Sequence, residues 1–259
     1  MRIAIITGAS SGIGEEFVRQ IPRCYKNLDE LWLVARSTEK LEKIKKEIES
    51  KYALSVRLYD GDLLRDYIFY RIEKDLAIFN PNIRILVNGA GFGKVGTVDE
   101  IDNKSQEQMV ELNCKALTRM TCLCMDYLSK GSRIINIASA SAFLPQPKFV
   151  VYAATKSYVL SFSRGLSMEL ADREIIVTAV CPGPVDTPFF KVAGSSDLTA
   201  KKAVMVQPKT VVRQALYDTR KKKEISICTM AMKGVRIASK ILPDSFLRAV
   251  MIKMFYNTK

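Results

Sequence analysis

The stretch that decides the fold of this chain is RIAIITGASSGIG, residues 2–14. Its first six residues form an apolar, β-branched run of the kind found in strands that are buried on both faces. Glycines recur in the turn that follows, and helical character begins at Gly12. Glycine permits a tight turn and close approach to a pyrophosphate, while the helix start offers free N–H groups. Because the turn joins a strand to a helix, it is predicted to bind phosphate. The residues expected to do so are Gly8, Ser10, Ser11, Gly12, Ile13 and Gly14.

Outward from this turn, short β-branched runs alternate with longer helical stretches. Strands are expected at residues 2–7, 30–35, 54–59, 83–88, 132–138, 174–181 and 224–229, and helices at 12–21, 38–50, 64–79, 105–128 and 151–171. Such alternation predicts a parallel sheet of about seven strands with helices on both faces. Right-handed crossovers make the doubly wound Rossmann fold the leading topology. No linker-like segment divides residues 1–259, so we expect a single domain of the α/β class.

Composition limits the chemistry that this chain can perform. It has 259 residues, of which 48% are hydrophobic, enough for a sizeable core. It contains no histidine, which excludes Ser-His-Asp and Cys-His catalysis. Its six cysteines form no CxxC pair, so we expect reduced thiols and no metal site. Any proton transfer must therefore use Tyr, Lys, Asp, Glu, Cys or Ser.

A formal net charge of +13 suits a nucleic acid, an anionic membrane surface or phosphorylated ligands, or reflects only a basic solvated surface. The basic residues are spread out and no nucleic-acid-binding motif occurs, so we expect no nucleic-acid partner. No stretch has the roughly 18 apolar residues of a membrane-spanning helix, and residues 1–8 do not resemble a secretory signal. The expected location is the cytoplasm.

The end of the second expected strand bears on the choice of cofactor. It reads Val34-Ala35-Arg36-Ser37, with an arginine where NAD-binding proteins of this fold commonly place an acid. A guanidinium can pair with a 2′-phosphate and stack on adenine, and Ser37 can add a hydroxyl. NADP(H) is therefore favoured over NAD(H), although Arg36 is also readily explained as a solvated loop cation.

Tyr152 and Lys156 occur in the sequence YAATK, on an expected helix. The i,i+4 spacing places both side chains on one helix face. A phenol has a pKa of about 10, and a neighbouring ammonium lowers it. The pair could then exchange a proton with a carbonyl oxygen or an alcohol near physiological pH. This spacing also arises by chance, so the interpretation depends on companion residues.

The glycine turn, the YAATK pair, the sequence Asn88-Gly89-Ala90-Gly91 and the Pro182-Gly183 pair together resemble the short-chain dehydrogenase/reductase family, from Arg2 to about Phe190. The resemblance implies a nicotinamide-dependent oxidoreductase. It further implies that Ser139 holds the substrate oxygen beside Tyr152, that Lys156 binds the nicotinamide ribose, and that Asn113 is a structural and proton-relay residue. Ser141 is a second nearby hydroxyl, or only a loop serine.

The same resemblance assigns further cofactor contacts. Asp62 would contact adenine with help from the Leu63 backbone, although Asp60 lies close by. Asp62 could also cap the next helix, a role that is compatible with the contact. Gly89 stands where the family has a second asparagine, which puts local stability in doubt. The other implied contacts are Asn88, Gly89 and Ala90 near the ribose, and Pro182, Gly183, Val185 and Thr187 near the nicotinamide.

Residues 188–207 would be the variable substrate lid of this family. The segment is rich in apolar residues, which favours a lipophilic carbonyl or alcohol substrate. The sequence looks closest to the hydroxysteroid dehydrogenase and 3-oxoacyl reductase branches, and the choice between a steroid and a fatty-acyl substrate stays open. A non-catalytic NADPH-binding sensor and a membrane-associated module are the alternatives of another class. Retention of Asn113, Ser139, Tyr152 and Lys156 favours an enzyme.

Residues 230–259 are basic and apolar, and Pro243 divides them into two expected amphipathic helices. Packing near the substrate opening or against a partner subunit is preferred over attachment to a membrane surface. The family resemblance implies a homodimer or a homotetramer.

Overall fold

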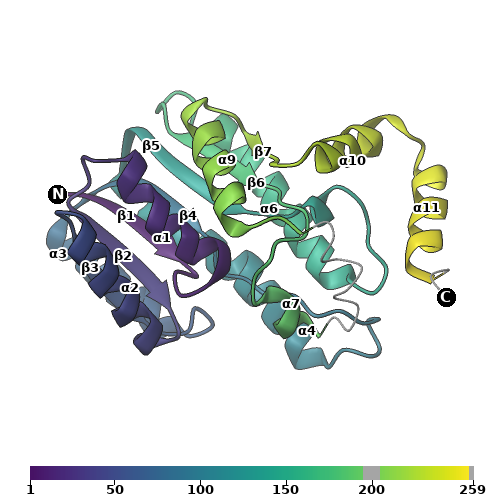
Figure 1. Ribbon diagram of the computed structural model, residues 1–259, viewed down its shortest axis with the longest axis horizontal. Coiled ribbons are helices and arrows are strands. Elements are labelled where there is room, and N and C mark those ends of the chain that lie inside the picture. Colours follow the sequence, from purple (N-terminus) through teal and green to yellow (C-terminus); the bar gives the residue numbers. More distant parts are fainter. Residues whose placement is uncertain (195–204, 257–259) are drawn as a thin grey trace.

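The computed structural model describes residues 1–194 and 205–256 (Figure 1). Its centre is a seven-stranded sheet in the order β3-β2-β1-β4-β5-β6-β7, and every neighbouring pair is parallel. The strands are β1 (Arg2–Thr7), β2 (Glu30–Ala35), β3 (Ser55–Asp60), β4 (Asn82–Asn88), β5 (Leu128–Ile137), β6 (Ile176–Val180) and β7 (Ile225–Ser226). The predicted doubly wound fold is confirmed, because the order reverses beside β1, where the chain crosses to β4.

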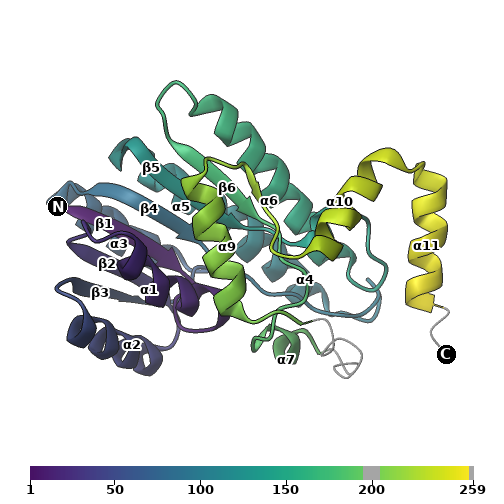
Figure 2. The ribbon, with the colours of Figure 1, turned by 45° about the horizontal axis from the view of Figure 1, so that its top comes forward.

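Helices cover both faces of the sheet (Figure 2). On one face lie α1 (Gly12–Cys24), α2 (Thr38–Lys51) and α9 (Pro208–Arg220), whose apolar sides share one core cluster with β1 and β2. On the other face lie α3 (Asp66–Phe79), α5 (Leu117–Cys124) and α6 (Val150–Glu169). Helix α9 was missed from the sequence, although Pro208 occupies its first turn and its buried apolar residues recur at helical spacing.

The expected long helix over residues 105–128 is wrong in its continuity and in its end. The structure has α4 (Asn103–Val110), a π-helical turn η1 (Glu111–Ala116), α5 and a 3₁₀ turn η2 (Met125–Tyr127). Strand β5 already begins at Leu128. A π-helical turn disturbs the regular helical ladder, and here it carries the buried Asn113.

A polar network at the middle of the sheet joins four of these elements. The Asn88 side-chain nitrogen donates to Thr121 Oγ1 on α5 at 3.0 Å and to Asn136 Oδ1 on β5 at 2.9 Å. Asn136 in turn donates to Ser163 Oγ on α6 at 2.9 Å. All four side chains are buried, so the network fixes β4, β5 and the two helices behind them relative to one another.

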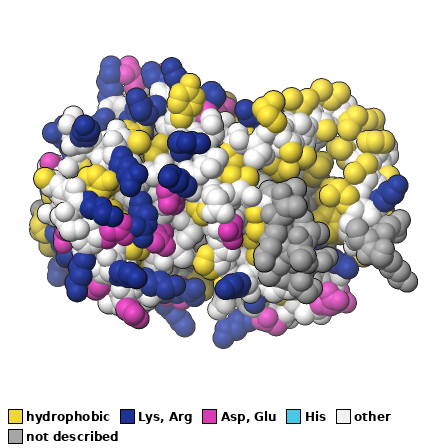
Figure 3. Space-filling view, in the orientation of Figure 1, with side chains coloured by type: hydrophobic (Ala, Val, Ile, Leu, Met, Phe, Trp, Pro, Cys, Tyr) yellow, Lys and Arg dark blue, Asp and Glu magenta, His cyan; other side chains and the backbone are white. Residues whose placement is uncertain are grey.

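Two C-terminal helices, α10 (Met230–Ile241) and α11 (Asp244–Tyr256), project from the end of the molecule remote from β3 (Figures 1 and 2). The predicted break at Pro243 is confirmed. Helix α10 has no buried residue, and α11 buries only Leu247 and Met251. Hydrophobic side chains gather over this end (Figure 3). None of the helices that the structure describes is long and apolar enough to cross a membrane.

The predicted lid is only partly described. Of the expected residues 188–207, the structure describes 188–194, which include the short helix α7 (Phe189–Ala193), and 205–207, where Val206 forms a parallel bridge with Val185. Residues 195–204, which contain the middle of the expected lid, lie outside the described residues.

The first turn brings β1 and α1 into very close contact. A Cβ atom at Gly14 would lie 2.1 Å from the Gly8 carbonyl oxygen, a distance that no side chain tolerates. Helix α1 can therefore begin where it does only if residue 14 is glycine. In contrast, Gly165 in α6 has nothing within 4 Å of the position that its Cβ would take.

We therefore expect Gly14→Ala to lower the free energy of unfolding by about 1–3 kcal/mol, because the backbone must shift to admit the methyl group. Gly165→Ala is the matched control and should raise it by about 0.5–1 kcal/mol, since alanine favours a helix. Urea unfolding followed by circular dichroism measures both. Equal stability of Gly14→Ala and the unmodified chain would contradict the close contact.

Candidate active site

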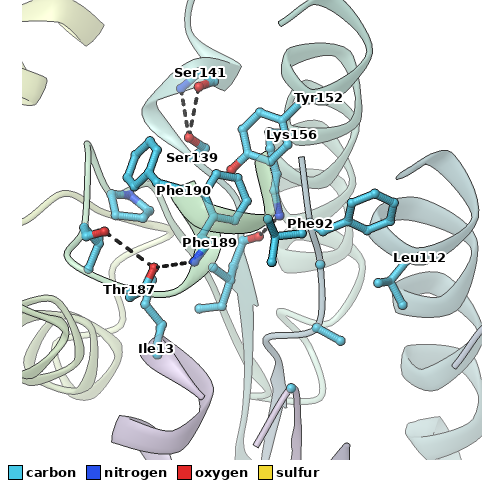
Figure 4. Close-up of a pocket in the computed structure, with 18 of the residues that line it drawn as sticks. Ile13, Phe92, Leu112, Ser139, Ser141, Tyr152, Lys156, Thr187, Phe189 and Phe190 are labelled. Atoms are coloured by element: carbon cyan, nitrogen blue, oxygen red, sulfur yellow. Dashed lines mark hydrogen bonds between the residues drawn. The ribbon is translucent and has the colours of Figure 1, made fainter. Parts of the chain in front are cut away.

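A cavity of about 750 Å³ lies at the carboxyl ends of the parallel strands (Figure 4). This is where ligands bind in open α/β sheets. All six residues predicted for the phosphate-binding turn line it. Gly8 and Gly12 have φ angles of +70° and +56°, which residues with a Cβ rarely adopt. The turn and the start of α1 together form a cradle that fits a pyrophosphate, because the first N–H groups of a helix have no partner within it.

The two candidate aspartates differ in their position relative to the far end of the cavity. Asp62 lines the cavity, and its carboxylate accepts a hydrogen bond from the backbone of Leu64 at 3.0 Å. Asp60 does not line it and is held instead by Arg71 and Thr38, each at 3.1 Å. The alternative that Asp62 caps α3 is wrong, because that helix begins only at Asp66.

Arg36 and Leu63 also line this end of the cavity, and the Arg36 side chain is exposed. Ser37, which was expected beside them, is not among the lining residues and precedes α2. An exposed guanidinium therefore lies beside the cavity just after β2 ends.

At the end of β4 the predicted residues divide into two groups. Gly89 and Ala90 line the cavity, whereas Asn88 points into the polar network of the sheet. Thr7 Oγ1 accepts hydrogen bonds from the Gly89 and Ala90 nitrogens at 3.0 and 3.2 Å. A Cβ at Gly89 would lie 2.8 Å from the Thr7 carbonyl oxygen. Glycine at position 89, where the family has a second asparagine, therefore leaves room for the backbone of β1.

Tyr152, Lys156 and Ser139 meet at the middle of the cavity (Figure 4). Lys156 Nζ donates to the carbonyl oxygen of Ile137, the last residue of β5, at 2.7 Å. Ser139 Oγ accepts from the Ser141 nitrogen at 3.1 Å and lies 3.2 Å from Ser141 Oγ. The three predicted residues therefore converge from β5 and the first two turns of α6, and Ser141 lines the cavity beside them.

Aromatic side chains enclose the phenol ring of Tyr152. Phe149 stacks on it with a centroid distance of 4.2 Å, and Phe189 from α7 lies at 5.3 Å. A Cβ at Gly93 would lie 2.8 Å from the ring, so the loop after β4 closes a further side. The ring is held on several sides, and its orientation is set before any substrate arrives.

Burial dominates the acidity of both groups. It raises the pKa of Tyr152 to about 12, against a smaller lowering by the hydrogen bond with Ser139. It lowers the pKa of Lys156 to about 8. The expectation that the ammonium lowers the pKa of Tyr152 is wrong in this respect, because the desolvation of a buried phenolate outweighs it. At neutral pH Tyr152 is a neutral phenol that can donate a proton.

Asn113 lies behind the cavity wall. Its amide nitrogen donates to the Phe92 carbonyl at 2.9 Å and to Thr155 Oγ1 at 3.0 Å, and its oxygen accepts from the Phe92 nitrogen at 3.1 Å. It does not line the cavity. These contacts tie the loop after β4 to α6, which supports the structural part of the role that was expected for it.

The segment after β6 completes the wall. It lines the cavity with the four residues that were expected near the nicotinamide, Pro182, Gly183, Val185 and Thr187. Thr187 Oγ1 accepts a hydrogen bond from the Phe189 nitrogen at 3.3 Å. Its methyl group would lie 3.0 Å from a Cβ at Gly12, so this segment meets the phosphate-binding turn.

Sequence reasoning found only part of the loops that follow β4 and β5, and it named no individual lining residue on α4, η1 or the C-terminal helices. For the two loops, their position after the ends of central strands was the available signal. The missed lining residues include Phe92, Lys94, Val95, Ser105, Gln108, Leu112, Leu144, Gln146, Lys148, Phe149, Met232, Val235, Met251, Met254 and Phe255. The last five belong to α10 and α11, so the described part of the C-terminal segment, residues 230–256, lies beside the cavity as expected.

Comparison with known proteins agrees with this geometry. The family model for short-chain dehydrogenases matches residues 2–197. A very-long-chain 3-oxoacyl-CoA reductase from Danio rerio is 33% identical over 199 residues, which are 73% of this chain and 61% of that protein. The 17-beta-hydroxysteroid dehydrogenase type 3 of Rattus norvegicus is 31% identical over 200 residues, 76% of this chain and 64% of that protein. This chain thus matches about three fifths of the length of these relatives.

Among solved structures, a short-chain dehydrogenase from Sphingobium yanoikuyae in complex with NADPH superposes with a TM-score of 0.80 at 27% identity. The match covers 94% of this chain and 96% of that one. The family model, the relatives and the fold agree, and the chain belongs to the short-chain dehydrogenase/reductase family of nicotinamide-dependent oxidoreductases.

Proposed function

We propose that this chain is an NADP(H)-dependent reductase of lipophilic carbonyl compounds, with Tyr152 as the proton donor. The observation that carries the proposal is the buried Tyr152 phenol, which is held neutral beside Ser139 in a largely apolar cavity. A general acid must carry its proton at working pH, and the raised pKa of this phenol supports that role. The protonated phenol is the form that reduction needs. The same group would take the proton back in the reverse oxidation, so the supply of reduced cofactor would set the direction.

The residues that would hold the cofactor follow the length of the cavity. The glycine turn and the start of α1 would bind the pyrophosphate, and Arg36 the 2′-phosphate. Asp62 and Leu63 would contact adenine, Gly89, Ala90 and Lys156 the nicotinamide ribose, and Pro182, Gly183, Val185 and Thr187 the carboxamide. The bound cofactor supplies the hydride, and the chain supplies position and the proton.

Three side chains would act on the substrate oxygen or beside it. Ser139 would donate a hydrogen bond to the carbonyl oxygen, and Tyr152 would give it a proton as the alcohol forms. The Lys156 ammonium, anchored on the Ile137 carbonyl, would stabilise the negative charge left on the phenol oxygen. Asn113 would keep the loop after β4 in place against α6.

The remaining lining supports a lipophilic substrate. The side chains around the substrate end are mostly aliphatic or aromatic, and the exposed lining is more apolar than polar. They are Val95, Leu144, Phe149, Phe189, Phe190, Val192, Met232, Val235, Met251 and Phe255. A steroid or a similar bulky ketone fits this chemistry.

A second candidate is a 3-oxoacyl thioester of coenzyme A. Lys94 and Lys148 line the same cavity, and Lys148 Nζ lies 5.4 Å from the ring centroid of Tyr256 on α11. Two cations near the opening would suit the phosphates of coenzyme A, with the acyl chain on the apolar wall. Preference for a 3-oxoacyl-CoA over a ketosteroid in one panel of carbonyl substrates would select this candidate.

Tyr152→Phe should lower kcat for a carbonyl reduced by the unmodified chain by about 10²–10⁴-fold, because the general acid is lost while the ring keeps its aromatic contacts. The affinity for NADPH, followed by its fluorescence, should be unchanged. Tyr158→Phe is the matched control, because that phenol is exposed on the same helix. Full turnover by Tyr152→Phe would refute the role, and NADPH binding without turnover of any carbonyl would favour a sensor.

Arg36→Asp should weaken NADPH binding by about tenfold to a hundredfold, because a charge-assisted contact with the 2′-phosphate is replaced by repulsion. NADH binding should be unchanged or tighter, since a carboxylate can accept from the ribose hydroxyls. Arg213→Asp on α9 makes the same charge change away from the cavity. Two results would count against a contact between Arg36 and the 2′-phosphate. One is that Arg36→Asp weakens the binding of NADPH and NADH equally, and the other is that Arg213→Asp weakens NADPH binding as much as Arg36→Asp does.

The value of kcat/KM for NADPH should fall as the pH rises above about 8, because Lys156 then loses its proton. The titration of Lys156 would not cause this loss by destabilising the fold. Between pH 8 and about 10.5 the unfolded chain keeps this proton, so the contribution of Lys156 to stability rises with pH. Lys156→Arg stays charged and should show no such decline, whatever its absolute rate. An unchanged midpoint in that variant would assign the decline to another group.

A further inference from the structure

Helix α10 carries apolar side chains on two different sides. Met232 and Val235 face the cavity and line it. Met230, Ile237 and Ile241 occur at positions i, i+7 and i+11, which share one helix face. They are 78%, 58% and 73% exposed. One side of α10 therefore serves the cavity, and the other presents a stripe of large apolar groups to the surroundings.

The connection to α11 and α11 itself extend this apolar surface. Leu242, Phe246 and Ile252 are 38%, 53% and 43% exposed. Figure 3 shows hydrophobic side chains gathered over the arch that α10 and α11 form, at the end of the molecule away from most of the charged surface in that view. Concentration of this kind is unlike the scattered exposed apolar residues of an ordinary soluble surface.

Cations accompany the apolar stripe. Residues 230–256 contain five of them, Lys233, Arg236, Lys240, Arg248 and Lys253, against the single carboxylate of Asp244. Lys233 and Lys240 are seven residues apart, so they share the face that borders the stripe of α10. An apolar stripe bordered by lysines is the pattern of helices that lie in the interface of a bilayer.

We propose that α10 and α11 dock this chain on an anionic phospholipid bilayer. A second copy of the chain is the other occupant to consider, and charge argues against it. Two copies joined through this surface would bring together ten cations and two carboxylates, within chains that each carry +13. Anionic headgroups complement both the charge and the apolar groups. The docking does not depend on the reaction proposed above.

The site lies close to the proposed contact. Met251 and Phe255 of α11 and Met232 of α10 line the cavity, so the docked helices would also form part of its wall. Docking would therefore leave the body of the chain in solution while one wall of the cavity faces the bilayer.

Flotation of the full chain with vesicles tests this proposal. Vesicles of phosphatidylcholine alone are compared with vesicles that also contain phosphatidylserine, at low and high salt. The two test variants are Ile237→Ser with Ile241→Ser, and Lys233→Glu with Lys240→Glu, and none of these residues lines the cavity. The controls are Ile78→Ser on α3, where the side chain is 61% exposed, and Lys43→Glu with Lys46→Glu on α2.

We expect the unmodified chain and both controls to float with the anionic vesicles and to be released by salt, and both α10 variants to lose at least about tenfold in partition. NADPH binding by every variant verifies its fold. The proposal is overturned if the unmodified chain does not prefer anionic vesicles, or if the α10 variants float like the controls. It is also overturned if light scattering shows a dimer that the isoleucine variant dissociates, while no form binds vesicles.

Discussion

The site depends on one buried hydrogen bond, from the Lys156 ammonium to the carbonyl oxygen of Ile137. A lysine is rarely buried to this extent, and its charge there requires a partner. This bond fastens α6 to the end of β5. It thereby sets the position of Tyr152, one helical turn earlier, and of Ser139, two residues beyond the acceptor. A shift of the helix along the strand would separate all three, so the packing of one lysine determines the geometry of the site.

The same burial determines the electrostatics of the site. Exclusion of water raises the pKa of Tyr152 and lowers that of Lys156, because each charged form loses hydration. It also strengthens every interaction with charge that develops on a substrate oxygen. The aromatic groups Phe149 and Phe189 contribute to both effects, since they cover the phenol ring while leaving the cavity side open. The packing around Tyr152 and Lys156 thus sets both the orientation of the phenol ring and the pKa of each group.

Much of the fold was predictable because its signals are local. Residues 2–14 alone are enough to predict the β1 strand and the glycine turn. The i,i+4 spacing of Tyr152 and Lys156 is enough to place both side chains on one helix face. The π-helical turn around Asn113 was not predictable, because its hydrogen-bond partners, Phe92 and Thr155, are distant in sequence. The pKa of Tyr152 was misjudged for a similar reason, since burial is a property of the whole fold. The inward direction of Asn88 likewise depends on a strand 48 residues away.

That inward direction of Asn88 has a consequence for assembly of the sheet during folding. Asn88 and Asn136 are paired in register across β4 and β5, deep in an otherwise apolar sheet. If β5 slipped by one residue, each amide would face apolar groups, and every unpaired polar group costs about 1–3 kcal/mol. The slipped pairing would therefore be disfavoured once α5 and α6 cover this face of the sheet, because Thr121 and Ser163 on those helices are the further partners of the two amides. The pairing of the two asparagines would thus fix the register of β5 against β4, and with it the positions of Ile137 and of Ser139, which follows the strand.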